Sequence, residues 1–242
     1  MKIQRYPDLE GISRAAAELF VEQAQLAATS RGRFSVALSG GHTPKRLFAV
    51  LASPPFRAQA PWDKIHVFWG DERYVSPDDP RSNYRMARET LLQHVPIPAE
   101  QIHPMMMADQ PAQAAEQYEQ VLRAYFDKEA PTLDLVYLGL GDNGHTASLF
   151  PGTPVLTEQR RWVVDVYVAE QDMYRLTLTA PMINQARLVA FLVAGADKAQ
   201  VLNEVIHGSF DPQRLPAQLI QPQPGELRWL IDEAAAGQLP QK

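Results

Sequence analysis

The sequence contains no cysteine among its 242 residues. This absence excludes a disulfide scaffold, a thiolate nucleophile, and the zinc and iron–sulfur sites that depend on cysteine ligands. The histidines and carboxylates also lack the paired spacing that metal ligands show on a helix, so we expect no metal site. Chemistry on this chain therefore has to rest on other side chains and on water.

Positive charge is also scarce: the chain has 23 lysines and arginines but 28 aspartates and glutamates, which gives a net charge of −5. A field of this sign disfavours nucleic acid, and a small anionic ligand needs a local cluster of cations. There is no run of about 18 apolar residues that would span a membrane. The opening residues MKIQRYPDLEG lack the apolar segment of a secretory signal. We expect a cytoplasmic protein without nucleic-acid or membrane partners, and we favour a monomer.

Short apolar runs alternate with helical patterns along the chain. The runs predict buried strands at residues 34–38, 65–69, 133–138, 162–168, 175–179 and 188–193. Apolar spacings of three and four, together with capping residues, predict helices at residues 8–31, 45–52, 83–92, 111–130, 197–207 and 224–236, and Ser82 is the expected N-cap of the third. Solidly apolar strands that alternate with helices are typical of an α/β fold. We expect one domain over residues 1–242, with a mostly parallel central sheet, helices on both faces and a Rossmann-like open topology.

Three polar segments come directly after predicted strands. They are SGGHTP at residues 39–44, GDER at residues 70–73 and GLGDNGH at residues 139–145. In open α/β sheets, ligands bind beyond the carboxyl ends of the strands. We therefore expect these three segments to form the functional site together.

The segment SGGHTP has the parts of a phosphate-binding loop. Gly40 and Gly41 allow backbone N–H groups to approach an anion, and Ser39 and Thr43 add hydroxyl donors. Pro44 marks the first turn of a helix whose positive end would point at the same anion. The spacing differs from that of the G-x-x-x-x-G-K-[ST] nucleotide loop. The alternative is a tight strand-to-helix turn that needs glycine for its geometry alone.

The segment GDER places two carboxylates and a guanidinium after a strand. Arg73 could clamp a phosphate with two hydrogen bonds. Asp71 could accept a proton or bind a sugar hydroxyl. The alternative is a surface ion pair, which contributes little to stability and needs no function.

The segment GLGDNGH matches the dinucleotide-binding pattern G-x-G-x-x-G. That motif needs a sizeable helix after its third glycine, to pack on the sheet. Pro151 leaves space for only about one helical turn, so we expect no nicotinamide cofactor. The same segment ends in His145, which would lie at the start of that short turn. A neutral imidazole at such a place suits a general base, and the alternative is a histidine bonded to backbone.

Two further cations are Arg175, at the start of RLTLT, and Lys198, at the start of a predicted helix. Without other evidence, a lysine or arginine is more typically a solvated charge than a ligand contact. The order of all these segments, however, resembles that of the 6-phosphogluconolactonase family, from about residue 30 to residue 236. SGGHTP and GHTASLFPGTP are the most specific parts of the resemblance. Glucosamine-6-phosphate deaminases of the wider superfamily share the Gly-Gly-x-Thr-Pro loop, but HTASLFP favours the lactonase branch.

The resemblance implies cofactor-free hydrolysis of 6-phospho-D-glucono-1,5-lactone to 6-phosphogluconate, in the oxidative pentose phosphate pathway. His145 would be the general base, and Asp71 matches the strand-end acid that the deaminases use on the sugar. The residues that would bind the sugar or its phosphate are Ser39, Gly40, Gly41, Thr43, Arg73, Asn143, Arg175 and Lys198.

The sequence departs from the family pattern at two positions. His42 stands where serine is frequent, and Asn143 where aspartate is frequent. Asn143 can form hydrogen bonds but carries no charge, so we consider the adjacent Asp142 as a substitute for the carboxylate. Two other functions stay open. One is an amino-sugar-phosphate isomerase/deaminase with Asp71 as base, and the other is a sugar-phosphate-binding module without catalysis.

Overall fold

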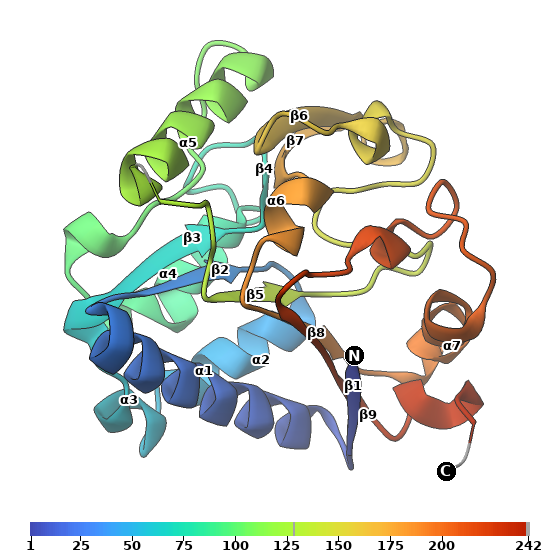
Figure 1. Ribbon diagram of the computed structural model, residues 1–242, viewed down its shortest axis with the longest axis horizontal. Coiled ribbons are helices and arrows are strands. Elements are labelled where there is room, and N and C mark those ends of the chain that lie inside the picture. The colour runs from blue at the N-terminus through green and yellow to red at the C-terminus, as the bar shows by residue number, and fades with distance from the viewer. Residues whose placement is uncertain (128, 241–242) are drawn as a thin grey trace.

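The computed structural model describes residues 1–127 and 129–240. Its centre is a six-stranded sheet in the order β1-β9-β8-β5-β2-β3, in which every neighbouring pair is parallel (Figure 1). The strands of this sheet are β1 (Lys2–Tyr6), β2 (Phe34–Leu38), β3 (Ile65–Trp69), β5 (Leu135–Leu138), β8 (Leu188–Val193) and β9 (Glu226–Asp232). This confirms the predicted α/β fold with an open parallel sheet.

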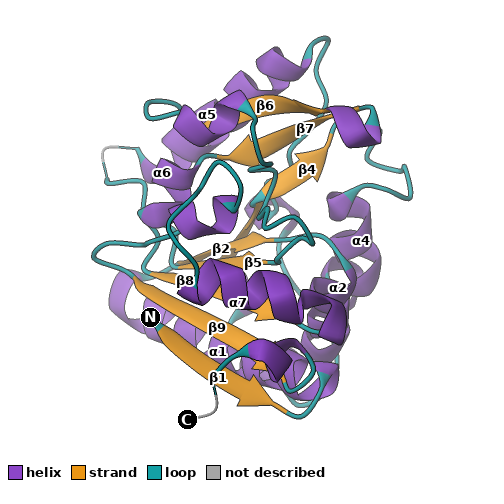
Figure 2. Cartoon of the chain, turned by 90° about the vertical axis from the view of Figure 1, so that its right-hand side faces the viewer, coloured by secondary structure: helices purple, strands orange, loops and turns teal. Residues whose placement is uncertain are grey.

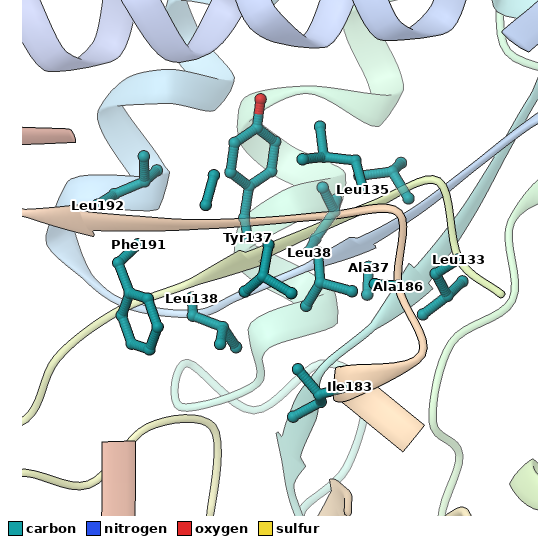
Figure 3. Packing of buried hydrophobic residues seen from close by; sticks show 14 of the residues in the cluster. Ala37, Leu38, Leu133, Leu135, Tyr137, Leu138, Ile183, Ala186, Phe191 and Leu192 are labelled. Atoms are coloured by element: carbon teal, nitrogen blue, oxygen red, sulfur yellow. The ribbon is translucent and has the colours of Figure 1, made fainter. Parts of the chain in front are cut away.

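Helices cover both faces of this sheet, as predicted. In Figure 3, Tyr137 of β5 points toward α1, and its hydroxyl donates a hydrogen bond to the Ala16 carbonyl at 2.6 Å. Phe191 of β8 points to the other face, where Ile183 of α6 lies. Within the described residues, no helix is both long and apolar enough to cross a bilayer. The helices are α1 (Leu9–Arg31), α2 (His42–Leu51), α3 (Phe56–Gln59), α4 (Asn83–Thr90), α5 (Pro111–Phe126), α6 (Ala180–Asn184) and α7 (Ala199–His207).

A second, three-stranded sheet lies above the first (Figure 2). The predicted strands at 162–168 and 175–179 belong to this antiparallel sheet and not to the central one, and the segment expected to be a GDER loop supplies its third strand. The two longer strands are joined by a short turn, which favours antiparallel pairing, and the outer one keeps polar and exposed positions. The strands are β4 (Asp71–Arg73), β6 (Val163–Val168) and β7 (Met173–Leu178).

Gly70 joins the two sheets between β3 and β4. Its N–H donates to the carbonyl of Leu38 at the end of β2, and its carbonyl accepts from the N–H of Leu178 at the end of β7, both at 2.8 Å. The chain therefore passes from the central sheet into the small sheet at one residue. This places the polar side chains of β4 above the carboxyl edge of the central sheet.

The prediction of a helix at 224–236 is wrong. Glu226–Asp232 form β9, which pairs with β1 on one side and β8 on the other. Strand β1, at Lys2–Tyr6, was not predicted at all, because its side chains are mostly polar and exposed. Strand pairing with residues at the far end of the chain overrides local helix preference here, since Trp229 and its neighbours become buried only between those partners.

Candidate active site

A cavity of about 610 Å³ lies at the carboxyl ends of β2, β3, β5 and β8. The three polar segments meet there, as the strand-end rule predicts. Arg175 and Lys198, which the sequence taken alone assigned to solvent, join them. Asn143 is the one predicted site residue that does not line the cavity. The lining includes Ser39, Gly40, Gly41, Thr43, Asp71, Arg73, His145, Arg175 and Lys198.

The loop between β2 and α2 presents a free helix end to the cavity. Helix α2 begins at His42, earlier than predicted, and no side chain caps its first turn. Its first N–H groups are therefore available to an anion. Thr43 of that turn lines the cavity, and the buried Ser39 hydroxyl donates to the Tyr137 carbonyl at 2.8 Å, which fixes the start of the loop.

Two arginines of the small sheet reach the cavity side by side. Arg73 and Arg175 are directly paired residues of β4 and β7. Arg175 is only 7% exposed, and burial lowers the pKa of its guanidinium, although Asp71 at 3.5 Å opposes this effect. Arg73 donates to the Arg81 carbonyl, and the Nε atoms of both arginines are buried without a partner in the described chain. Like charges placed opposite each other are unfavourable, so this pair favours a bound anion.

Asp71 is 5% exposed and already has partners. The hydroxyl of the fully buried Ser148 donates to Asp71 Oδ2 at 2.7 Å, and Arg175 approaches the same oxygen. The Asn83 carboxamide donates to the backbone carbonyl of Asp71 at 2.9 Å. The carboxylate is therefore a fixed part of the site and holds Arg175 in place.

Asn143 determines which nitrogen of His145 carries the proton. Its Oδ1 lies 2.6 Å from His145 Nδ1 and 3.2 Å from the His145 backbone N–H. Because an amide oxygen only accepts hydrogen bonds, Nδ1 is the protonated nitrogen and Nε2 keeps its lone pair. The ring lies directly over Gly141, where any Cβ would overlap it. The imidazole is thus fixed in both tautomer and position.

His145 is neutral because of burial. Burial lowers its pKa to about 4, the positive charges of Arg175 and Lys198 act in the same direction, and Asp71 opposes them. Phe150 stacks on the ring, with 4.2 Å between centroids and 19° between planes. An imidazole in this state is an available base at neutral pH.

The short helical turn expected after Gly144 does not form. Thr146 and Leu149 instead make an isolated bridge, with a turn between them. A helix end therefore does not account for the neutral imidazole, and the G-x-G-x-x-G match lacks the helix that dinucleotide binding needs.

Asp142 does not replace the missing carboxylate beside His145. It forms an ion pair with Lys198, which also lies 3.7 Å from Asp197. The uncharged Asn143 makes the hydrogen bond to the imidazole instead. The group beside Nδ1 of the imidazole is therefore a neutral amide oxygen and not a carboxylate.

Three residues that hold side chains of the site in place were not predicted: Asn83, Ser148 and Phe150. Ser148 and Phe150 lie in the segment HTASLFP. The family resemblance of that segment indicated that the region is functional, but it did not predict which side chains these two residues contact. Asn83 was read only as the start of a helix. That helix does begin after Ser82, whose hydroxyl accepts from the Arg85 N–H at 3.1 Å, as predicted.

In the described part of the chain, no cluster of three or more acidic or histidine side chains could hold a metal.

The sequence matches the model of the family "Glucosamine-6-phosphate isomerases/6-phosphogluconolactonase" over residues 7–229. A 6-phosphogluconolactonase of Synechocystis sp. is 53% identical over 218 residues, 88% of each chain. Another, of Nostoc sp., is 46% identical over 242 residues, 98% of each chain. The solved structure of 6-phosphogluconolactonase from Trypanosoma cruzi matches with a TM-score of 0.88 at 28% identity, over 99% of this chain and 97% of that one. The chain therefore belongs to the family of glucosamine-6-phosphate isomerases and 6-phosphogluconolactonases, on its 6-phosphogluconolactonase branch.

Proposed function

We propose that the protein hydrolyses 6-phospho-D-glucono-1,5-lactone to 6-phospho-D-gluconate, a step of the oxidative pentose phosphate pathway. The observation that carries this proposal is the state of His145. Its Nδ1 is bound by Asn143, its pKa is lowered to about 4, and it lines a cavity that also contains arginine side chains. A neutral imidazole with a free Nε2 can take a proton from water, and a lactone carbonyl is electrophilic enough to be attacked by that water.

The phosphate is bound by groups from both sheets. The uncapped first turn of α2 and the Gly40-Gly41 loop supply N–H donors from one side. Arg73, Arg175 and Lys198 supply positive charge. Hydrogen bonds to charged groups are worth about 1.5–3 kcal/mol each, so this set binds a dianion despite the negative net charge. Binding at the phosphate orients C1 of the ring toward His145.

Hydrolysis then needs only water as a second reactant. His145 Nε2 removes a proton from the water as its oxygen bonds to C1, and the carbonyl becomes a tetrahedral oxyanion. When this intermediate collapses, the bond between C1 and the ring oxygen breaks. The imidazolium returns its proton to that oxygen, which becomes the C5 hydroxyl. The new carboxylic acid releases its own proton to solvent, and His145 is neutral again.

The isomerase/deaminase alternative would use Asp71 as a base on the sugar. Ser148 and Arg175 both bind Asp71 Oδ2, so this carboxylate is already engaged in holding the cation. This arrangement favours lactone hydrolysis. Ammonia release from glucosamine 6-phosphate by the wild-type protein would instead support the deaminase.

His145→Ala tests the proposed function. Lactone hydrolysis, measured by a coupled assay and corrected for spontaneous hydrolysis, should fall by about 10²- to 10⁴-fold in kcat, with a small change in KM. His207→Ala is a matched control, because His207 is an exposed histidine at the end of α7. Turnover by His145→Ala close to that of the wild type would rule out His145 as the base. Binding of the sugar phosphate without turnover by the wild type would indicate the binding module.

A further inference from the structure

The phosphate site is shared between the two sheets. The Gly40-Gly41 loop belongs to the central sheet, whereas Arg73 and Arg175 belong to the small sheet that lies above it (Figure 2). A dianion bound by both halves is recognised only if their separation is correct. Helix α4 packs against both α2, which follows the loop, and β4, which carries Arg73. The start of α4 is therefore in a position to set that separation.

Asn83, the first residue of α4, contacts both halves of the site. Its Nδ2 donates to the Asp71 carbonyl at 2.9 Å and lies 3.4 Å from Asp71 Oδ1. Its carboxamide also lies against Gly40 so closely that a Cβ at Gly40 would overlap it. Asn83 lines the cavity, is 2% exposed, and its Oδ1 is buried without a hydrogen-bond partner in the described chain.

Glu72 holds Asn83 in this place. Asp71 and Arg73 face the cavity, and Glu72, between them in β4, points the opposite way, as strand alternation requires. Its carboxylate accepts from the N–H groups of Asn83 and Tyr84 at 2.7 Å each, and from the Ser82 hydroxyl at 3.0 Å. Glu72 thus caps α4 and ties the helix to the strand that carries the cavity side chains.

We propose that Asn83 is a positioning residue that fixes the phosphate-binding loop relative to Asp71 and Arg175, and so determines the preference for a phosphorylated lactone over an unphosphorylated one. This inference rests on the proposed function. Asn83 makes no hydrogen bond to His145, so the attack on the lactone carbonyl does not depend on it. Removing Asn83 frees the two halves of the phosphate site to shift relative to each other. A misplacement of about 1 Å can cost about 100-fold in rate.

The test compares two substrates, 6-phospho-D-glucono-1,5-lactone and D-glucono-1,5-lactone, in wild type, Asn83→Ala and Asn83→Ser. Both variants remove the carboxamide that donates to the Asp71 carbonyl, and neither adds a charge to the cavity. We expect kcat/KM for the phosphorylated lactone to fall by about 10- to 100-fold, mainly through KM. We expect the unphosphorylated lactone to be hydrolysed at the wild-type rate, which also shows that the variants fold.

Asn184→Ala is the matched control. Asn184 in α6 uses its carboxamide in the same way, donating to the Leu219 carbonyl at 2.8 Å and accepting from the Gln221 N–H at 2.7 Å, but it does not line the cavity. Its loss should lower the melting temperature and leave the ratio of the two substrates unchanged.

A second measurement tests the contact with Gly40. Gly40→Ala should weaken binding of the phosphorylated lactone in the wild-type background, because the new methyl group overlaps the Asn83 carboxamide. In the Asn83→Ala background, the same change should have a smaller effect, since space is available.

Three outcomes separate the possibilities. A loss confined to the phosphorylated lactone, together with non-additivity of the two substitutions, supports the proposal. Equal losses on both substrates, or additive effects, would overturn it, because Asn83 would then have only a general structural role. A wild-type protein that fails to hydrolyse 6-phospho-D-glucono-1,5-lactone would overturn the proposed function itself.

Discussion

Two buried aspartates, Asp134 and Asp71, lie at opposite ends of the strands of the central sheet, and their carboxylates have different partners. Asp134, before β5 at the amino-terminal edge, accepts from Arg31 at 2.7 Å and from both the N–H and the hydroxyl of Ser35. Arg187 lies 3.3 Å from the same carboxylate. Each oxygen therefore has strong partners, and the two arginines extend toward solvent. Nothing in this cluster requires a ligand.

Asp71 at the carboxyl edge is held less completely. Its arginine partner is 3.5 Å away, is almost fully buried, and has a second arginine beside it. The Nε atoms of these two guanidinium groups have no acceptor in the described chain. Of these two clusters, the one around Asp134 is satisfied within the protein, whereas the one at the cavity keeps two arginine donors unpaired within the described residues, as a site for an anionic ligand would require.

The largest expected contrast is between Arg175→Ala and Arg187→Ala. Arg175→Ala removes a buried cation from the cavity, so KM for the phosphorylated lactone should rise by about 10- to 100-fold. Arg187→Ala removes a half-exposed partner of Asp134, so KM should stay unchanged. Steady-state kinetics of both variants would measure this, and equal KM values in the two would contradict the assignment of Arg175 to the phosphate.

Substitution of Asp134 should lower stability without changing activity, whereas substitution of Asp71 should change activity. Asp134→Ala leaves the buried N–H of Ser35 without its acceptor, which should cost about 1–3 kcal/mol of unfolding free energy. Its activity per folded molecule should stay at the wild-type level. Asp71→Asn should instead raise KM for the phosphorylated lactone, because a neutral carboxamide holds the Arg175 guanidinium in place less firmly. Urea unfolding and kinetics on both variants would check this, and a loss of activity in folded Asp134→Ala would contradict the contrast.

The smallest effect concerns the protonation of His145. Its pKa of about 4 means that kcat/KM should be constant at neutral pH and decrease only as the pH falls through about 4, where the base becomes protonated. Asn143→Asp places a carboxylate beside Nδ1–H, stabilises the imidazolium and should move this acid limb up by about 1–2 pH units. Asn184→Asp, remote from the cavity, should leave it in place. An unchanged limb in Asn143→Asp would mean that His145 is not the titrating base.

The local parts of the fold and site could be predicted from the sequence. The apolar runs predicted the strands that bury both faces, and the helix that starts after Ser82 has its predicted cap. The Gly-Gly loop and the position of His145 after a strand could also be predicted, because the backbone freedom of glycine and the basicity of histidine are properties of the single residue. The single domain, the monomer and the cytoplasmic location stay predictions.

Other elements could not be predicted, because they depend on distant partners. Strand β9 looked helical and became a strand only between β1 and β8. Arg175 looked solvated, and its burial depends on Asp71 in a strand of a sheet that the sequence pattern did not reveal. The hydrogen bond between Asn143 and the imidazole likewise depends on the folded loop, and Asn143 lies outside the cavity lining.

The amino-acid sequence sets which groups this protein has available: no thiolate, a Gly-Gly loop before a helix, and a histidine just beyond the end of a strand. The tertiary structure alone decided how these groups work together. The hydrogen bond from Ser148 to Asp71 joins residues 77 positions apart, and Asn83 contacts residues of two sheets. Such contacts form only when the strands have paired and the sheets have packed, because side chains so far apart in the sequence have no local preference that brings them together.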